Sequence, residues 1–184
     1  TDDFELYIID SNSSDDTWEF IKTLKDERIK EKKNLNLNRG CAYAINYVMS
    51  KRKKEQFFFH LDSDTCMMTS DWITKFMEVM NEYPEIGAAS TVKPSILRYY
   101  SIYSKKLNKH GVEVGVIDAL IGNCLCIRPE VIDILGYFNE ETGRCDSDYS
   151  IRINKFTNYK KAGEIMSDYN FEESASYRIS KHLY

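Results

Sequence analysis

Three aspartates that could share one binding site follow two apolar runs of the sequence. Asp10 comes directly after the run Phe4 to Ile9. Asp62 and Asp64 follow the run Phe57 to Leu61. Short apolar runs of this kind are typical of strands covered on both faces of a sheet. Because open α/β sheets bind ligands beyond the carboxyl ends of their strands, we expect the three aspartates to lie on one edge of a sheet.

The spacing of Asp62 and Asp64 indicates a site for a divalent metal ion. One residue separates them, so in an extended segment both side chains point the same way. Two carboxylates that share a site repel each other, and one takes up a proton unless a cation lies between them. Mg²⁺ and Mn²⁺ bind carboxylate oxygens and keep positions open for phosphate oxygens. Because an Asp-x-Asp pair also occurs in many turns, its meaning depends on the rest of the sequence.

Strands that alternate with helices are expected to hold these aspartates in place. Further extended segments are predicted at 86–92, 116–121 and 123–127. Helices are predicted around Trp18 to Leu24, from Cys41 to Lys53, after Ser70, from Pro129 to Leu135 and from about Asp146. The charged run Lys25 to Lys33 is interpreted as a helix end and loop, and 93–115 as a loop with a short helix. This order predicts an α/β sandwich with a mainly parallel sheet.

The composition is that of a soluble globular protein with one domain. The chain has 184 residues, of which 42% are hydrophobic and 29% are charged. This length suffices for one sizeable domain, and these proportions are ordinary for a globular one. The net charge of −4 argues against nucleic-acid binding, because proteins that bind nucleic acids usually carry a basic face. No apolar run approaches the ~20 residues that a membrane span requires. The sequence therefore contains no indication of a nucleic-acid or membrane partner.

The cysteines favour a reducing compartment. There are five of them, and no two have the Cys-x-x-Cys spacing of a zinc or redox motif. An odd number without such a pair signals neither a disulfide framework nor a zinc site. We therefore expect a cytoplasmic protein.

Six elements of the sequence resemble, in order and spacing, those of the inverting, family-two GT-A glycosyltransferases. Together they cover about residues 4 to 152, and six in register are far more specific than any one alone. The elements are Ile8-Ile9-Asp10 with Ser13, Asp15 and Thr17; Asn38 with Gly40, Ala44 and Asn46; Phe57 to Asp64; Gly122 to Arg128; Gly136 to Glu140; and Asp146-Ser147-Asp148-Tyr149 with Arg152.

The resemblance implies a GT-A fold and a role for each matching aspartate. Asp10 would contact the nucleotide base, and Asn38 would lie by the nucleotide. Asp62 would contact the ribose or the metal, while Asp64 would be the principal ligand of Mn²⁺ or Mg²⁺. Asp146 would be the general base that deprotonates the acceptor. The implied reaction transfers a sugar from a nucleotide-diphosphate sugar to the hydroxyl of a glycan or another acceptor, with inversion.

Structural explanations exist for the same residues. Asp10 and Asp15 could form an Asx turn and a helix N-cap, and Asn38 with Gly40 could be a turn alone. Asp146 could be only the N-cap of the following helix. His60 lies inside a predicted strand and favours a core or interface position over a ligand. His182 could complete a metal shell, as a downstream histidine does in some relatives.

The sequence departs from the family pattern at three places. The family's first strand has no counterpart before Phe4, so we expect residues 1–184 to be a single catalytic domain that is incomplete at its N-terminus. Cys145 replaces the acid that usually precedes the base, and Ile45 stands where many relatives have a basic residue. Two other functions remain open: a non-catalytic module that binds a nucleotide sugar or glycan, and a Mg²⁺-dependent nucleotidyltransferase.

Overall fold

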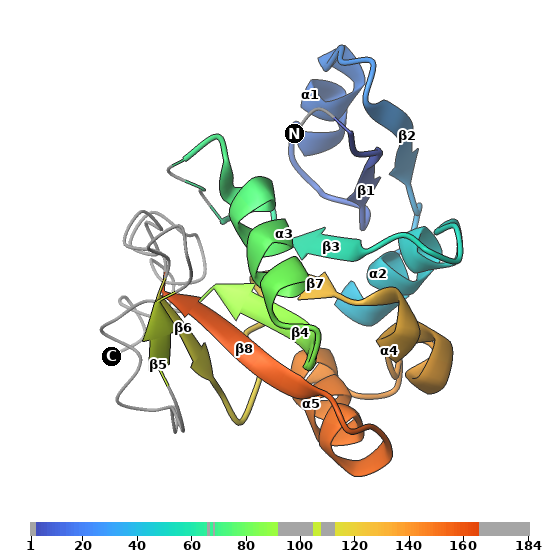
Figure 1. Cartoon of the computed structure of the whole chain (residues 1–184). Helices are drawn as coiled ribbons and strands as arrows, with labels where there is room; N and C mark the ends of the chain where they lie inside the picture. Colours follow the sequence, from blue (N-terminus) through green and yellow to red (C-terminus); the bar gives the residue numbers. More distant parts are fainter. Residues whose placement is uncertain (1–2, 66, 68, 92–104, 108–112, 166–184) are drawn as a thin grey trace, which may run out of the picture.

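Strands and helices alternate along the chain in the computed structural model, which describes residues 3–65, 67, 69–91, 105–107 and 113–165 (Figure 1). The strands are β1 (Leu6–Asp10), β2 (Ile29–Asn34), β3 (Phe58–Leu61), β4 (Ile86–Thr91), β5 (Lys105–Leu107), β6 (Glu113–Val116), β7 (Cys124–Ile127) and β8 (Lys160–Ile165). The helices are α1 (Thr17–Thr23), α2 (Cys41–Met49), α3 (Trp72–Glu82), α4 (Pro129–Leu135) and α5 (Cys145–Phe156). This alternation confirms the predicted α/β class.

The described strands form two sheets of mixed direction. Strands β1 and β2 pair in parallel and form a sheet of their own. The six-stranded sheet has the order β3-β7-β4-β8-β6-β5, in which only β4 and β8 are parallel neighbours. Strand β7 runs antiparallel between β3 and β4, and β6 runs antiparallel to both of its neighbours. The described sheet is therefore mixed where the sequence predicted a mainly parallel one, because β7 and β6 are inserted between strands that share a direction.

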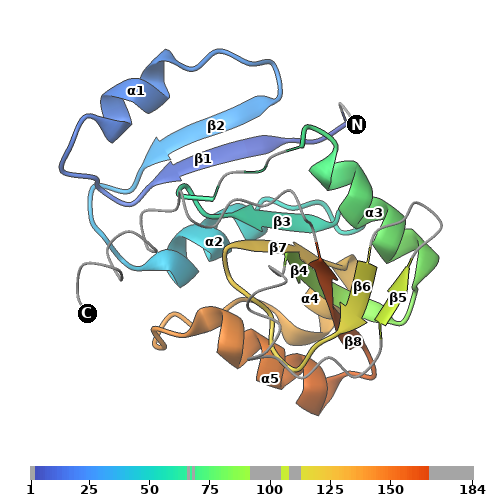
Figure 2. The same ribbon diagram turned by 90° about the vertical axis from the view of Figure 1, so that its left-hand side faces the viewer.

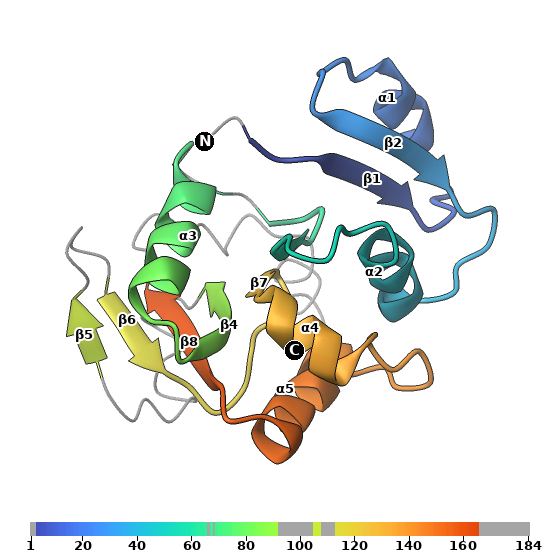
Figure 3. The ribbon, with the colours of Figure 1, turned by 45° about the vertical axis from the view of Figure 1, so that its right-hand side comes forward.

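Helices cover both faces of the six-stranded sheet and give a three-layer sandwich (Figure 3). Helix α3 packs on one face through Phe76, Val79 and Met80, which contact Cys124 and Cys126 of β7 in one buried cluster. Helices α2, α4 and α5 contribute to a second buried cluster on the other face. This cluster contains Leu125 and Ile127 of β7. Since successive side chains of a strand point to opposite faces, β7 is apolar throughout and supplies both clusters.

Three strands, β2, β5 and most of β6, formed where loops were predicted, whereas the segment predicted as extended at 116–121 is a strand only at Val116. The second half of the charged run belongs to β2, which pairs with β1 from Ile29 to Asn34. Its Lys32 donates hydrogen bonds to the carbonyls of Lys22 and Leu24 at the end of α1, so the cation neutralises the negative end of that helix. Strand β5 pairs with β6 inside the region predicted as a loop with a short helix. These segments are strands because each pairs with a neighbouring strand, and no local pattern of the sequence indicates that pairing.

The ends of α4 follow the sequence prediction. Pro129 occupies the first turn, where its missing N–H leaves no bond unmade. Gly136 follows the last residue with a φ of 70°. Glycine adopts this left-handed conformation without strain. Helix α2 ends at Met49, earlier than the predicted Lys53.

The carboxyl ends of β1 and β3 lie on the same side of the molecule as the amino ends of α2 and α5 (Figure 2). Asp10 is the last residue of β1, and Asp62 directly follows β3. The arrangement agrees with the prediction that these two aspartates share one edge of the fold. We call this region the carboxyl edge.

Candidate active site

Asp62 is fixed at the end of β3 by its own backbone. Its N–H donates a hydrogen bond to the carbonyl of Asn123 at 2.8 Å, which extends the pairing of β3 with β7 by one residue. Its carboxylate lies 2.9 Å from Nε2 of His60. The Asp62 side chain is about 40% exposed. The backbone is thus held while the carboxylate remains accessible from the carboxyl edge.

Asp146 lies in the first turn of α5, where backbone groups position it. Its Oδ1 accepts a hydrogen bond from the N–H of Ser147 at 2.8 Å. The hydroxyl of Ser150 donates to the Asp146 carbonyl at 2.8 Å and accepts from the N–H of Leu120 at 2.9 Å. The N-cap of α5 is Arg144, so Asp146 is not the N-cap of this helix. The serine connects the first turn of α5 to the segment that precedes β7.

The dipeptide Gly122-Asn123 joins the two aspartates. A Cβ placed on Gly122 would stand 3.3 Å from Oδ2 of Asp146, which shows how closely that carboxylate approaches the backbone. Asn123 accepts the hydrogen bond from Asp62. Both carboxylates also act electrostatically on the same thiol, that of Cys41. Two acids that are far apart in the sequence therefore meet at one point of the carboxyl edge.

Asp10 is almost fully buried, with 3% of its surface exposed. Its carboxylate accepts hydrogen bonds from the N–H and hydroxyl of Ser13 and, at 2.6 Å, from the side-chain amide of Asn34 at the end of β2. Asp15 accepts a hydrogen bond from the N–H of Thr17, the first residue of α1. The contacts of Asp10 are those of the structural explanation, in which it organises a turn. The N-cap of α1 is Asp16, so Asp15 is not the N-cap of this helix.

Asn38 forms the turn that leads into α2. Its side-chain oxygen accepts a hydrogen bond from the N–H of Gly40 at 2.9 Å, and Gly40 has a φ of 86°. Asn38 is exposed. Asp64 is half-buried in the turn after β3. It does not belong to the group of potential metal ligands described below.

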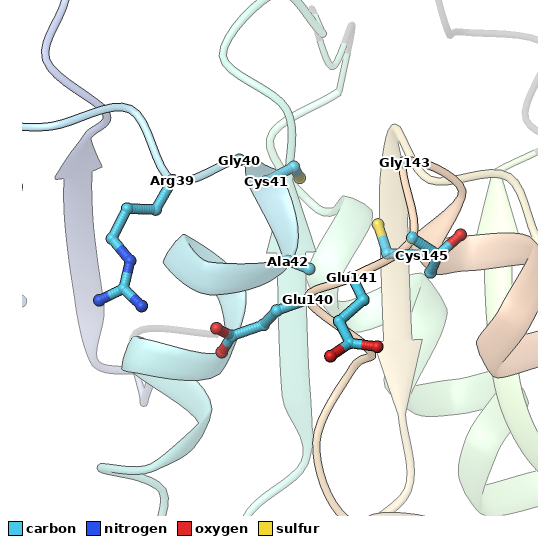
Figure 4. Close-up of a pocket in the computed structure, with 9 residues that line it drawn as sticks. Arg39, Gly40, Cys41, Ala42, Glu140, Glu141, Gly143 and Cys145 are labelled. Atoms are coloured by element: carbon cyan, nitrogen blue, oxygen red, sulfur yellow. The ribbon is translucent and has the colours of Figure 1, made fainter.

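Two thiols face each other between the amino ends of α2 and α5 (Figure 4). The thiol of Cys41 donates a hydrogen bond to the sulfur of Cys145, which lowers the pKa of Cys145 to about 7. The same hydrogen bond, together with partial desolvation of the otherwise exposed thiol, raises the pKa of Cys41 far above its usual range. Both residues line a cavity of about 190 Å³ together with Arg39, Gly40, Glu140 and Thr142. Cys145, which stands where the family has an acid, can therefore carry a negative charge.

Other residues of the family pattern connect the elements of the site. The side-chain amide of Asn46 in α2 bonds both to the carbonyl of Phe138, at 2.9 Å, and to its N–H, at 2.8 Å. It also donates to Glu140 at 2.9 Å. Asn46 is buried, so these bonds form a strong link between α2 and the loop after α4.

The two arginines of the pattern bind carbonyl groups. Arg128 donates to the carbonyls of Ile86, Met80 and Tyr83, and thus connects the end of α3 with the start of β4. Arg152 donates to the carbonyls of Leu135 and Tyr137 at the end of α4. Arg152 also forms an ion pair with Asp148 at 2.9 Å. This ion pair holds Asp148 against Arg152, which binds the end of α4. The carboxylate of Asp146 faces Gly122 instead.

The sequence did not indicate the grouping of Cys41, His60 and Cys145 around Asp62. His60 was assigned to a core or interface position, yet it contacts Asp62 directly. Both cysteines are the first residues of their helices, and both helices begin at the carboxyl edge. The shared position of the two cysteines at the starts of helices is the feature that could have indicated their grouping. His182 and the cluster Tyr99, Tyr100 and Tyr103, which was expected to influence acceptor choice, lie outside the described residues.

The model of glycosyl transferase family 2 matches residues 1–119, which is well over half of the chain. The chain therefore belongs to glycosyltransferase family 2. In the part of the chain that the structure describes, no helix is long and apolar enough to cross a membrane.

A curated relative supports the assignment over part of the chain. The UDP-Glc:alpha-D-GlcNAc-diphosphoundecaprenol beta-1,3-glucosyltransferase WfaP of Escherichia coli is 41% identical over 66 residues. The match covers 36% of this chain and 26% of that protein.

Solved structures of similar fold are glycosyltransferases. The mannosyltransferase PcManGT from Pyrobaculum calidifontis, in complex with GDP-Man and Mn²⁺, has a TM-score of 0.65 at 18% identity. That likeness covers 96% of this chain and 51% of the mannosyltransferase. TarS 1–349 of S. aureus in complex with UDP has a TM-score of 0.58 at 16% identity. That likeness covers 90% of this chain and 50% of the TarS 1–349 chain. The fold is thus the GT-A fold, and the chain spans about half the length of these transferases or less.

Proposed function

We propose that this chain transfers a sugar from a nucleotide-diphosphate sugar to an acceptor hydroxyl, with a divalent metal ion and with inversion. The observation that carries the proposal is the meeting of Asp62 and Asp146 at Gly122-Asn123, on the carboxyl edge of the sandwich. Sugar transfer with a metal ion requires one carboxylate that binds the ion beside the leaving diphosphate. It also requires a separate carboxylate that takes the proton of the acceptor hydroxyl. Two acidic residues from different elements, held at neighbouring residues of one backbone segment, meet this requirement.

Asp146 is the proposed general base. It lies in the first turn of α5, and the hydrogen bond from the N–H of Ser147 fixes the direction of its carboxylate. The base takes the proton of the acceptor hydroxyl while the hydroxyl oxygen bonds to the anomeric carbon. The nucleoside diphosphate leaves from the opposite face of the sugar, which inverts the configuration. Membership of the family and the match of Asp146-Ser147-Asp148 to its pattern support this role.

Asp62 and Asp64 are the proposed ligands of Mn²⁺ or Mg²⁺. Carboxylate oxygens are the ligands that these hard ions prefer, and the accessible carboxylate of Asp62 fits this chemistry. When bound, the ion would neutralise charge that develops on the leaving diphosphate. The complex of PcManGT with GDP-Man and Mn²⁺ supports a divalent ion in a transferase of this fold.

The segment between β1 and α2 is proposed to hold the nucleotide. Asn38 is exposed beside the cavity that Arg39 and Gly40 line, and the amino end of α2 can stabilise phosphate charge. Asp10, which is bound to Ser13 and Asn34, is proposed to present this loop and to contact the base at its edge. The GDP-Man and UDP complexes of the two structural relatives support a nucleotide-sugar donor.

Release of nucleoside diphosphate tests the proposal. The chain is incubated with UDP- and GDP-sugars and Mn²⁺, and water serves as the acceptor where no glycan acceptor is supplied. We expect slow release from one donor that EDTA abolishes and that Asp146→Asn strongly reduces. Tight binding of a donor without release, in the presence of a range of glycan acceptors, would contradict catalysis and indicate a binding module.

A further inference from the structure

Two cysteines bring sulfur into a site that is otherwise built from oxygen and nitrogen ligands. Cys41 opens α2 and Cys145 opens α5, and their thiols are hydrogen-bonded to each other. Buried thiols often act only as small apolar side chains. Cys41 is instead exposed, and both thiols lie at the cavity on the carboxyl edge (Figure 4). Cys145 is partly buried and packs against the apolar cluster of α2, α4 and α5, whereas packing does not explain the exposed Cys41.

A histidine and an aspartate complete the group. The ligand atoms of Cys41, His60 and Asp62 all lie within 4.8 Å of one another. Among the described residues, this is the one cluster of three or more such side chains that could hold a metal ion. Nε2 of His60 and Oδ1 of Asp62 are 2.9 Å apart. Cys145 is not one of these mutually close residues, but its sulfur interacts with that of Cys41, and we take it as a fourth ligand that has to move toward the ion.

The types of the four ligands select a thiophilic ion. Zn²⁺ binds cysteine sulfur, histidine nitrogen and carboxylate oxygen in a tetrahedral arrangement, with bonds of about 2.0–2.3 Å. Atoms at the corners of such a tetrahedron are about 3–4 Å apart, as follows from those bond lengths. The 2.9 Å between His60 and Asp62 is close to such an edge, and the Cys41 sulfur, within 4.8 Å of both, needs a small shift to complete the site. Mn²⁺ and Mg²⁺ prefer oxygen ligands and octahedral geometry, and two sulfurs suit them poorly.

We propose that Cys41, His60, Asp62 and Cys145 form a Zn²⁺ site that competes with the catalytic ion. The competition rests on the proposed function, in which Asp62 also binds Mn²⁺ or Mg²⁺. Binding of Zn²⁺ releases the two thiol protons to solvent and breaks the His60–Asp62 hydrogen bond. The carboxylate of Asp62 is then occupied, and the ion fills the space beside Asp146. Zn²⁺ at this site inhibits sugar transfer.

Cobalt absorption tests the site without any assay of activity. Reduced, desalted protein is titrated with Co²⁺ under argon. The site predicts the visible bands of tetrahedral Co²⁺ and a near-ultraviolet band of thiolate-to-cobalt charge transfer, both saturating at one equivalent. Added Zn²⁺ should abolish these bands, because Zn²⁺ displaces Co²⁺ from sites of this kind. Absence of the charge-transfer band at stoichiometric Co²⁺ would overturn the proposal.

Single substitutions connect the bands to these residues. We expect Cys41→Ser, Cys145→Ser and His60→Gln each to lower Co²⁺ affinity at least about 10-fold, the lower end of what loss of a supporting group costs a metal site. Cys126→Ala is the matched control, because Cys126 is buried in the core against α3 and should leave the titration unchanged. Cys41 is exposed, so its serine variant should fold even where Cys145→Ser does not. Unchanged bands in Cys41→Ser would overturn the assignment.

Competition separates this inference from the proposed function. Zn²⁺ should inhibit Mn²⁺-dependent donor turnover in the wild type at about one equivalent. Each variant is compared with its own rate in Mn²⁺ alone, and Cys41→Ser, which keeps Asp62 and Asp64, should require at least about 10-fold more Zn²⁺. Cobalt bands without turnover would support the site and contradict the transferase function. Mn²⁺-dependent turnover without the cobalt bands would support the transferase function and contradict the Zn²⁺ site.

Discussion

The carboxylate of Asp146 lies against the backbone of Gly122, so closely that a Cβ on this glycine would stand 3.3 Å from Oδ2. The next residue, Asn123, accepts the backbone hydrogen bond of Asp62. The two proposed functional acids therefore share one short backbone segment as their support. Any side chain at position 122 should displace the proposed base while leaving the end of β3 intact.

Gly122→Ala should lower the rate of sugar transfer about 10-fold and leave donor affinity unchanged. The added methyl group makes a contact tighter than most, and the carboxylate has to move by a few tenths of an ångström. Small displacements of a catalytic group are costly because the reaction requires precise alignment. Single-turnover transfer and donor titration would measure the two effects separately.

Gly143→Ala is the control for this experiment. A Cβ on Gly143 would meet no atom within 4 Å, so the same change of residue type adds no contact. We expect its transfer rate to equal that of the wild type. Equal rates in Gly122→Ala and Gly143→Ala would show that the position of Asp146 does not limit transfer.

Asp64→Ala should abolish Mn²⁺-dependent binding of nucleotide with little effect on the free energy of unfolding. The reason is that a polar side chain at the carboxyl edge contributes little to the core. Calorimetric titration of UDP and GDP with and without Mn²⁺ is the measurement. Unchanged binding in the variant would remove Asp64 from the metal site.

Local sequence patterns predicted three strands of the six-stranded sheet, β3, β4 and β7, and did not indicate β8. Continuous apolar runs identified β3 and β4, because their two faces are both covered by helices. Pro129 and Gly136 marked the two ends of α4. The same patterns failed at β2, where every residue is at least partly exposed and pairing with β1 decides the structure. Strand direction was also missed, since no local feature shows that β7 is inserted between β3 and β4.

The sequence predicted the position of an acidic residue of the site but not the residues that surround it. Asp62 could be placed at the edge because it ends an apolar run. Its neighbours Cys41 and Cys145 come from the starts of two helices, and only the packing of those helices brings the sulfurs together. The burial of Asp10 against Asn34 likewise depends on β2, the strand that its charged sequence did not predict.

Asn46→Ala should lower the free energy of unfolding by about 2–6 kcal/mol. The substitution leaves the N–H and the carbonyl of Phe138 without their partner, and unsatisfied buried groups cost about 1–3 kcal/mol each. Urea unfolding measures the change. Asn81→Ala is the control, because Asn81 is an exposed residue of α3. A surface substitution of this kind should change stability by roughly 0.5 kcal/mol at most. Similar losses in both variants would contradict the linking role of Asn46.

The stability of the fold should fall at alkaline pH through Tyr149. This tyrosine is fully buried, and burial raises its pKa to about 12. The unfolded chain ionises near the ordinary pKa of about 10, so the folded state holds the proton more tightly. The stabilisation is complete below pH 10 and is lost as pH rises from 10 to 12, by about 1.4 kcal/mol per unit.

Tyr149→Phe should remove this dependence on pH. The variant loses the hydrogen bond to the carbonyl of Gly136, which costs about 1 kcal/mol at every pH. Above pH 10 the stability of the wild type should therefore fall toward that of the variant. Urea unfolding across this range measures both proteins, and parallel curves would show that Tyr149 ionises normally in the fold.

The transfer rate of Asp146→Asn, compared with that of Asp148→Asn, tests the central claim most directly. The amide keeps the shape of Asp146 but cannot accept a proton, so single-turnover transfer should fall by about 10²–10⁴-fold with donor affinity retained. Asp148→Asn should lose only its ion pair with Arg152 and keep its rate. A wild-type rate in Asp146→Asn, or the large loss in Asp148→Asn instead, would contradict the account.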